Sequence, residues 1–208
     1  MAALDDRCEL LEQAWRWWGD AVAALDTDAW QRSTRLPDWN IGALVAHHAM
    51  FVSLLGFVAS QPLGDPPTVL SARDMLRRFN EPDGVATTAA GVVSQMAQQQ
   101  AAERSAAEFV SMFRETAPEV LANVRAAGPI VVEYLGNGAF PLTEVLSIGL
   151  LEAVVHGLDL RAAVDELPAL PDVTLAFATD LLASMADPME FIEAATGRRS
   201  DPVLPVLR

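Results

Sequence analysis

The sequence predicts an all-α protein, an antiparallel four-helix bundle with short extra helices and a small extended segment. Apolar residues recur at helical spacing through several long stretches. Proline, glycine and aspartate separate these stretches, and residues that favour helix N-caps precede several of them. Outside the C-terminal tail, only residues 128–134 look extended. Helix-on-helix packing is therefore the expected architecture.

The N-terminal part is expected to contain two long helices and one short helix. The first helix covers about residues 4–25, with apolar residues that include Leu11, Trp15 and Trp18 at helical spacing. Asp26 and Asp28 offer caps for a short turn that carries Trp30. Asn40 is a good N-cap for the second helix, which continues to about Ser60. A break at 61–67, a short helix at 71–79 and a second break at 82–84 follow.

The C-terminal part begins with one long helical pattern, residues 86–127, relieved only by Pro118. Residues 128–134 are expected to be extended, and residues 136–138 supply a turn. Further helices are expected at about 141–164 and 172–185, with a short helical piece at 190–195 and an extended tail at 196–208. The sequence shows no internal repeat and no dividing linker, so we expect a single domain over residues 1–208.

Composition excludes several classes of function. The formal net charge is −14 and the sequence pI is near 4.4, so neither nucleic acid nor an acidic membrane surface is expected as a partner. All 14 basic residues are Arg, which excludes Schiff-base chemistry. The same Lys-free, Ala-rich usage is typical of a high-GC coding bias and hints at an actinobacterial source. Cys8 is the single cysteine, so no disulfide is expected.

One stretch is apolar enough to cross a membrane. Residues 40–64 contain no charged side chain, and residues 41–58 are nearly all apolar. Two adjacent histidines near its centre, and the absence of Arg or Lys close to its ends, favour a buried core helix instead. The N-terminus is acidic and has no apolar signal region, so we expect a cytoplasmic protein.

The chemistry-bearing residues lie in two helical stretches that contain all three histidines. Glu152 and His156 are four residues apart and therefore share one helix face. Asp159 follows three residues later and can accept a hydrogen bond from the second imidazole nitrogen, as histidine ligands of metals commonly require. Taken alone, this pattern also fits an ordinary Glu–His pair on a helix surface.

The other stretch supplies His47 and His48, which point about 100° apart on a helix, so normally one of them can face a given site. One histidine of this stretch, with Glu152 and His156, makes an open site of two imidazoles and one carboxylate. Zinc is the first expectation for such a site, and nickel or ferrous iron would accept the same ligands. A hydrogen-bonded core histidine is the alternative.

Two motifs carry a resemblance to a known family. Leu36-Pro37-Asp38-Trp39-Asn40-Ile41 leading into Leu44-Val45-Ala46-His47, and later Glu152-Ala153-Val154-Val155-His156-Gly157-Leu158-Asp159-Leu160, resemble the two signature stretches of the DinB-like superfamily. More closely, they resemble the N-terminal, metal-binding domain of the mycothiol-dependent maleylpyruvate isomerase family. Residues 136–141 and 197–204 fit the same group. The resemblance implies a DinB-like bundle with metal ligands at His47, Glu152 and His156.

The resemblance also implies thiol chemistry. A metal-activated low-molecular-weight thiol, mycothiol in this family, would attack a small electrophile. His48 stands where an aliphatic residue is expected, so it is either a core histidine or part of the pocket wall. Two departures weaken transfer of the isomerase activity: the isomerase has a second, C-terminal domain that this sequence lacks, and Gly149 stands where an arginine is expected.

We therefore expect first a metal-dependent thiol transferase or isomerase whose partners are a thiol and a small-molecule substrate. A non-catalytic metal- or small-ligand-binding bundle is the alternative, and a metal-dependent hydrolase comes third because no spare base stands out. A homodimer stays open: Trp15, Trp17 and Trp18 are not expected to face one core together, and an exposed tryptophan could mark an interface. The paired arginines Arg77–Arg78 and Arg198–Arg199 are candidate contacts for an acidic substrate.

Overall fold

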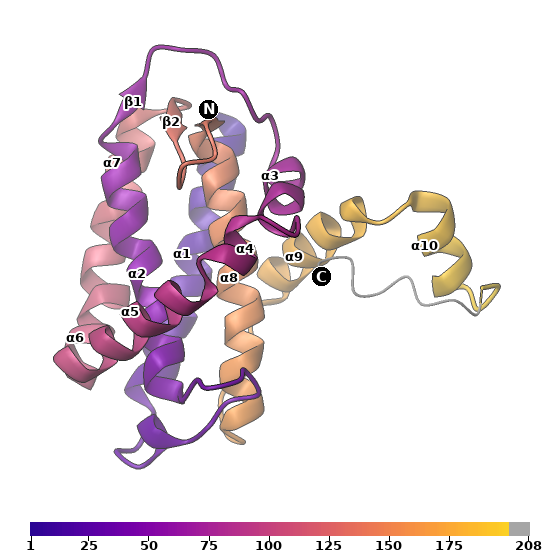
Figure 1. Cartoon of the computed structure of the whole chain (residues 1–208). Coiled ribbons are helices and arrows are strands. Elements are labelled where there is room, and N and C mark those ends of the chain that lie inside the picture. Colours follow the sequence, from indigo (N-terminus) through magenta and orange to yellow (C-terminus); the bar gives the residue numbers. More distant parts are fainter. Residues whose placement is uncertain (200–208) are drawn as a thin grey trace.

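The computed structural model describes residues 1–199 and confirms the all-α prediction (Figure 1). Its elements are, in chain order, α1 (Ala2–Ala23), the 3₁₀ helix η1 (Ala29–Gln31), α2 (Ile41–Ala59), β1 (Pro62–Leu63), α3 (Ala72–Phe79), α4 (Val85–Thr88), α5 (Ala90–Glu103), α6 (Ala106–Ser111), the π-helical segment η2 (Met112–Thr116), α7 (Ala117–Ala127), β2 (Val131–Glu133), β3 (Ala139–Pro141), α8 (Leu142–Ala163), α9 (Asp172–Met185) and α10 (Pro188–Ala195).

Four helical units form the bundle: α1, α2, the continuous run α6–η2–α7, and α8. A small antiparallel sheet, in the order β1-β2-β3, lies at one end (Figure 1). Because α2 and α7 lead into this sheet and α8 leads out of it, α2 and α8 run in opposite directions. α1 runs alongside α8 in the same direction, since Arg7 donates to Ser147 and Trp18 donates to the Ala153 carbonyl.

The sheet contains the predicted extended segment and two strands that were not predicted, β1 and β3. Val132 of β2 pairs with Phe140 of β3 across the predicted turn, and Pro141, which was expected to begin a helix, is the last residue of β3. On its other edge β2 pairs with Pro62 and Leu63, which form β1 within the stretch expected to be only a break. The sheet fixes the ends of α2, α7 and α8 relative to one another.

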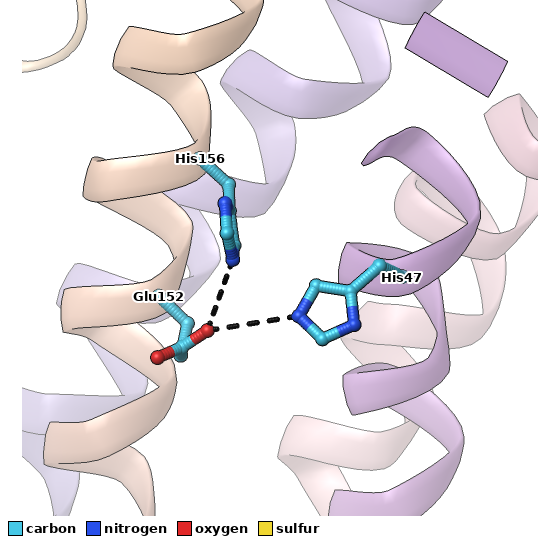
Figure 2. A group of neighbouring side chains, drawn as sticks. All are labelled: His47, Glu152 and His156. Carbon is cyan, nitrogen blue, oxygen red and sulfur yellow. Dashed lines mark ion pairs between the residues drawn. The ribbon is translucent and has the colours of Figure 1, made fainter. Parts of the chain in front are cut away.

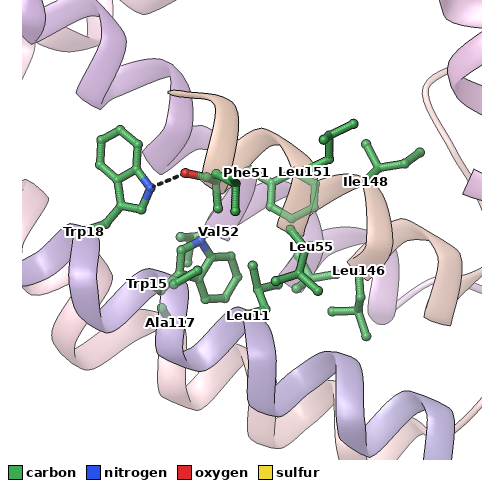
Figure 3. Close-up of a cluster of buried hydrophobic side chains, with 14 of the residues drawn as sticks. Leu11, Trp15, Trp18, Phe51, Val52, Leu55, Ala117, Leu146, Ile148 and Leu151 are labelled. Carbon is green, nitrogen blue, oxygen red and sulfur yellow. Dashed lines mark hydrogen bonds between the residues drawn. The ribbon is translucent and has the colours of Figure 1, made fainter. Parts of the chain in front are cut away.

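α2 is a largely buried helix of the bundle, packed against α5, α7 and α8. It begins as predicted, with the Asn40 side chain accepting a hydrogen bond from the Ala43 amide. Among the described residues it is the one helix long and apolar enough to cross a membrane, but 67% of its most apolar window is buried inside the protein. Aromatic and aliphatic side chains of α1, α2, α7 and α8 pack there into one hydrophobic core (Figure 3). This burial is the behaviour expected of the core helix of a soluble protein.

The expectation of one long helical pattern over residues 86–127, relieved only by Pro118, is wrong. The chain turns extended at Arg104, and Ser105 starts a new helix with a capping box. The Ser105 hydroxyl accepts from the Glu108 amide, and the Glu108 carboxylate accepts from the Ser105 amide. Pro118 causes no break: it lies just after the π-helical segment η2, and the helix continues through it as α7.

The expectation that Trp15, Trp17 and Trp18 do not all face the core is also wrong. Their exposed fractions are 1%, 6% and 0%. All three belong to the hydrophobic core, and Trp17 also contacts the segment between α8 and α9, where its indole Nε1 donates to the Pro168 carbonyl at 3.2 Å. A homodimer therefore stays a prediction without the support of an exposed tryptophan.

Two predictions concern residues that the structure does not describe. The extended tail at 196–208 and the family-like ending at 197–204 fall largely on residues 200–208, outside the described part. The prediction of a single domain over residues 1–208 therefore stays a prediction.

Candidate metal centre

Three side chains from α2 and α8 converge in the bundle: His47, Glu152 and His156, which we call the His–Glu–His cluster (Figure 2). Glu152 and His156 are one turn apart on α8, and His47 approaches from α2. Oε2 of Glu152 lies 3.2 Å from Nε2 of His156 and 3.8 Å from Nε2 of His47. The three potential ligand atoms all lie within 4.8 Å of one another. The structure thus brings together the three residues that the sequence singled out, from positions about a hundred residues apart.

A glycine allows α2 and α8 to approach closely beside the cluster. Gly149 is one turn before Glu152, and the Phe51 ring is one turn after His47. A Cβ atom at Gly149 would lie only 2.1 Å from Cε1 of Phe51, far inside ordinary carbon contact distance. The Phe51 ring therefore occupies the space that a side chain at Gly149 would need, in the place where the family resemblance led us to expect an arginine.

Asp159 lies where the sequence predicted it. Nδ1 of His156 is 2.9 Å from Oδ2 of Asp159, so its N–H donates to the carboxylate and Nε2 is directed at Glu152. The second oxygen of Asp159 accepts a hydrogen bond from Nε of Arg35 at 2.5 Å. Sequence reasoning missed Arg35, because it is 124 residues away from Asp159 and no local pattern links the two.

The pKa values of Glu152, His156 and Asp159 are shifted by the hydrogen bonds and charges of their neighbours. Burial alone would raise the pKa of Glu152, but the imidazoles of His156 and His47 hold it well below its usual range. Burial lowers the pKa of His156, yet its hydrogen bonds to Asp159 and Glu152 outweigh this effect and raise it to about 9. The pKa of Asp159 is likewise lowered, because His156 and Arg35 outweigh its burial. Without a metal, Glu152 is therefore an ionised carboxylate paired with a protonated His156.

His48 is a core histidine and does not face the cluster. Its ring stacks on Trp18 with centroids 4.4 Å apart and on Phe113 with centroids 5.7 Å apart. The side chain is buried, and within residues 1–199 neither ring nitrogen has a hydrogen-bond partner. Burial lowers the pKa of His48 well below its usual value, so the ring is neutral. Of the two roles considered from the sequence, the structure supports the core histidine.

Trp39 forms an aromatic wall beside the cluster. Its ring meets the His47 ring edge to face, with centroids 5.0 Å apart, and lies nearly parallel to the His156 ring at 6.4 Å.

Two of the arginines that the sequence offered as contacts for an acidic substrate have partners away from the cluster. Arg77 donates to the Met185 carbonyl, and Arg199 pairs with Glu190 at 2.9 Å. Neither contact involves the cluster.

The donor set suits a divalent metal. A tetrahedral ion at zinc-ligand distances separates its ligand atoms by about 3.3 Å, which is close to the 3.2 and 3.8 Å separations within the cluster. Two imidazoles and one carboxylate are ligands that zinc, nickel and ferrous iron accept. The Glu152 side chain is 39% exposed, so one side of the cluster is open to solvent. These residues fit a three-ligand site with an accessible further position.

Comparison with known proteins supports the fold and shows the family of the chain. The chain is similar to the crystal structure of a mycothiol-dependent maleylpyruvate isomerase, and to that of a histidine-to-alanine mutant of the same enzyme. In both comparisons the TM-score is 0.55 at 15% identity, over 89% of this chain and 70% of the other, which supports the predicted fold. No curated protein sequence matches the chain. Residues 11–161 match the family described as mycothiol maleylpyruvate isomerase N-terminal domain. Since this match covers well over half of the sequence, the chain belongs to the mycothiol maleylpyruvate isomerase N-terminal domain family.

Proposed function

We propose that the protein is a metal-dependent thiol transferase or isomerase that acts in the cytoplasm on a small electrophile. His47, Glu152 and His156 would bind one divalent metal, with zinc as the first choice and nickel or iron as alternatives. The thiol co-substrate would be mycothiol, which the name of the family suggests. The acidic surface, with a net charge of −14, is consistent with a small-molecule partner and not a nucleic acid.

The observation that carries this proposal is a ligand cluster with one open side. A divalent metal with a free position lowers the pKa of a coordinated thiol, so that a thiolate exists at neutral pH. Asp159 is committed to His156 and Arg35, and His48 is packed against Trp18, so neither side chain is available to close the site. This arrangement favours a catalytic metal over a purely structural one.

We favour thiol transfer over isomerisation of an acidic substrate. The space beside Gly149, one turn from Glu152, is filled by the Phe51 ring and has no room for a cationic side chain. Trp39 adds a second aromatic surface beside the cluster. An uncharged electrophile suits these surroundings better than a dianion would.

The test is a conjugation assay with metal-loaded protein, mycothiol and an uncharged electrophile such as monobromobimane, beside maleylpyruvate as the acidic substrate. Wild type should accelerate mycothiol consumption by the uncharged electrophile, and Glu152→Gln should lose this acceleration. Glu166→Gln, which changes an exposed carboxylate after α8, is the matched control and should behave as wild type. Metal binding without turnover of either substrate would favour the non-catalytic binding protein instead.

A further inference from the structure

Arg35 begins a chain of hydrogen bonds that ends at the cluster. Its Nε donates to Oδ1 of Asp159, and Oδ2 of Asp159 accepts from Nδ1 of His156 at 2.9 Å. The opposite nitrogen of His156 faces Glu152 at 3.2 Å. The two oxygens of one carboxylate thus serve two different partners. Rotation of the Asp159 carboxylate would disturb both bonds, so Arg35 restricts the orientation of His156 through it.

The ion pair between Arg35 and Asp159 offsets the cost of burying the Asp159 carboxylate. The Asp159 side chain is only 3% exposed, whereas the Arg35 side chain is 56% exposed. A buried carboxylate is costly unless charged or hydrogen-bonded partners surround it. Arg35 and His156 are the two hydrogen-bond partners of the Asp159 side chain within residues 1–199. Removal of Arg35 would therefore leave the carboxylate with His156 and water.

The loop that carries Arg35 is itself held in one conformation. An antiparallel bridge pairs Ser33 with Asn40 at its base. The Thr34 amide and hydroxyl both donate to the Trp39 carbonyl, at 2.9 and 3.0 Å. Gln98 of α5 donates to the carbonyl of Asp38, a residue that adopts a left-handed φ of 64°. Such a loop can present a side chain at a fixed position although its surface is exposed.

The loop contacts both histidines of the cluster. Trp39, four residues after Arg35, packs against the rings of His47 and His156. Arg35 approaches His156 from the other end, through Asp159. One eight-residue segment, 33–40, therefore meets the cluster directly through Trp39 and indirectly through the contact of Arg35 with Asp159.

We propose that Arg35 is a positioning residue of the metal centre, which fixes the Asp159 carboxylate and thereby the orientation of the ligand His156. The side-chain contact that the structure shows for Arg35 is with Asp159 and not with a ligand atom, so Arg35 acts on the site through Asp159. The inference rests on the proposed metal site, and it adds to that site a residue from a different part of the chain.

The test measures zinc affinity by competition with a chromophoric chelator, and the visible spectrum of the cobalt-substituted protein as a report of ligand geometry. Arg35→Ala should weaken zinc binding about tenfold, and Asp159→Asn about ten- to a hundredfold, as for other residues that orient metal-bound histidines. Arg35→Ala should also shift the cobalt bands. In the Asp159→Asn background, Arg35→Ala should have no further effect, because its route to His156 is already lost.

Arg32→Ala is the matched control, since Arg32 is an exposed arginine nearby that pairs with Asp26 and not with Asp159. It should leave the affinity and the cobalt spectrum unchanged, and urea unfolding confirms that each variant is folded. Wild-type affinity and spectrum in Arg35→Ala would overturn the inference while leaving the metal site intact. A further loss in the Asp159→Asn background would also overturn it, because Arg35 would then act by another route. Failure of the wild type itself to bind zinc or cobalt would overturn the proposed function and, with it, this inference.

Discussion

Replacement of Gly149 by alanine tests whether the Phe51 ring occupies the contact between α2 and α8 beside the cluster. In a helix interior, alanine is normally favoured over glycine by about 1 kcal/mol. Here the new Cβ would lie 2.1 Å from Cε1 and 2.4 Å from Cζ of Phe51. Because carbon atoms pack at about 3.5–4 Å, the ring or the helix must move by about 1.5 Å. Displacing a buried aromatic ring costs about 2–3 kcal/mol. The net expectation is a destabilisation of about 1–2 kcal/mol.

Urea unfolding of the metal-free protein, followed by circular dichroism, measures this difference in the free energy of unfolding. The matched control is Gly91→Ala in α5, where an added Cβ meets nothing within 4 Å and should be neutral or mildly stabilising. In a Phe51→Leu background the clash is relieved, so Gly149→Ala should no longer destabilise the protein. A Gly149→Ala protein as stable as the wild type, or more stable, would refute the close contact.

Three further predictions concern protons, the free thiol and the helix break. Zinc affinity should rise about tenfold per pH unit and level off near pH 9. Below that pH the metal must displace a proton from His156, because the pKa of His156 is raised to about 9. Competition titrations that give the same zinc affinity between about pH 6 and 9 would contradict this prediction. Cys8 is fully buried, and burial raises its pKa to about 11. Ellman's reagent at about pH 8 should therefore label the thiol of the native protein about a hundredfold more slowly than the thiol of the urea-unfolded protein. Equal labelling rates would show that the thiol is accessible in the native protein. Ser105→Ala should lower the free energy of unfolding by about 1 kcal/mol, and Ser105→Thr by less, because it retains the cap; an unchanged urea midpoint in Ser105→Ala would show that the cap contributes nothing.

Local signals in the sequence were enough to predict the main helices. The start of α2 follows from the capping preference of Asn40. The apolar periodicity of α1 and the nearly continuous apolar sequence of α2 agree with the burial of these helices. The break at Arg104 also had a local signal, the Ser105–Glu108 capping box. It was obscured by helix-forming alanine and glutamine on the preceding side, which continue the helical pattern without interruption.

Long-range contacts account for what sequence reasoning missed at the site. Helical spacing alone places Glu152, His156 and Asp159 on one face, because these residues share one helix. Arg35 reaches Asp159 only because the loop after η1 lies against the end of α8. The burial of Trp17 likewise depends on Pro168, a residue 151 positions away. Such contacts depend on how the helices pack, which the periodicity of a single helix does not reveal.

Elemental analysis of untagged protein, purified without added metal, tests the central claim most directly. Wild type should contain about one equivalent of zinc, and His47→Ala and Glu152→Ala should each lose it, while Glu166→Ala should retain it. Such a result would establish the metal centre formed by α2 and α8 and justify the search for its thiol and electrophile. A wild-type protein that contains no metal and cannot be loaded with zinc, nickel or iron would contradict the claim, leaving a helical bundle with a half-buried Glu–His network.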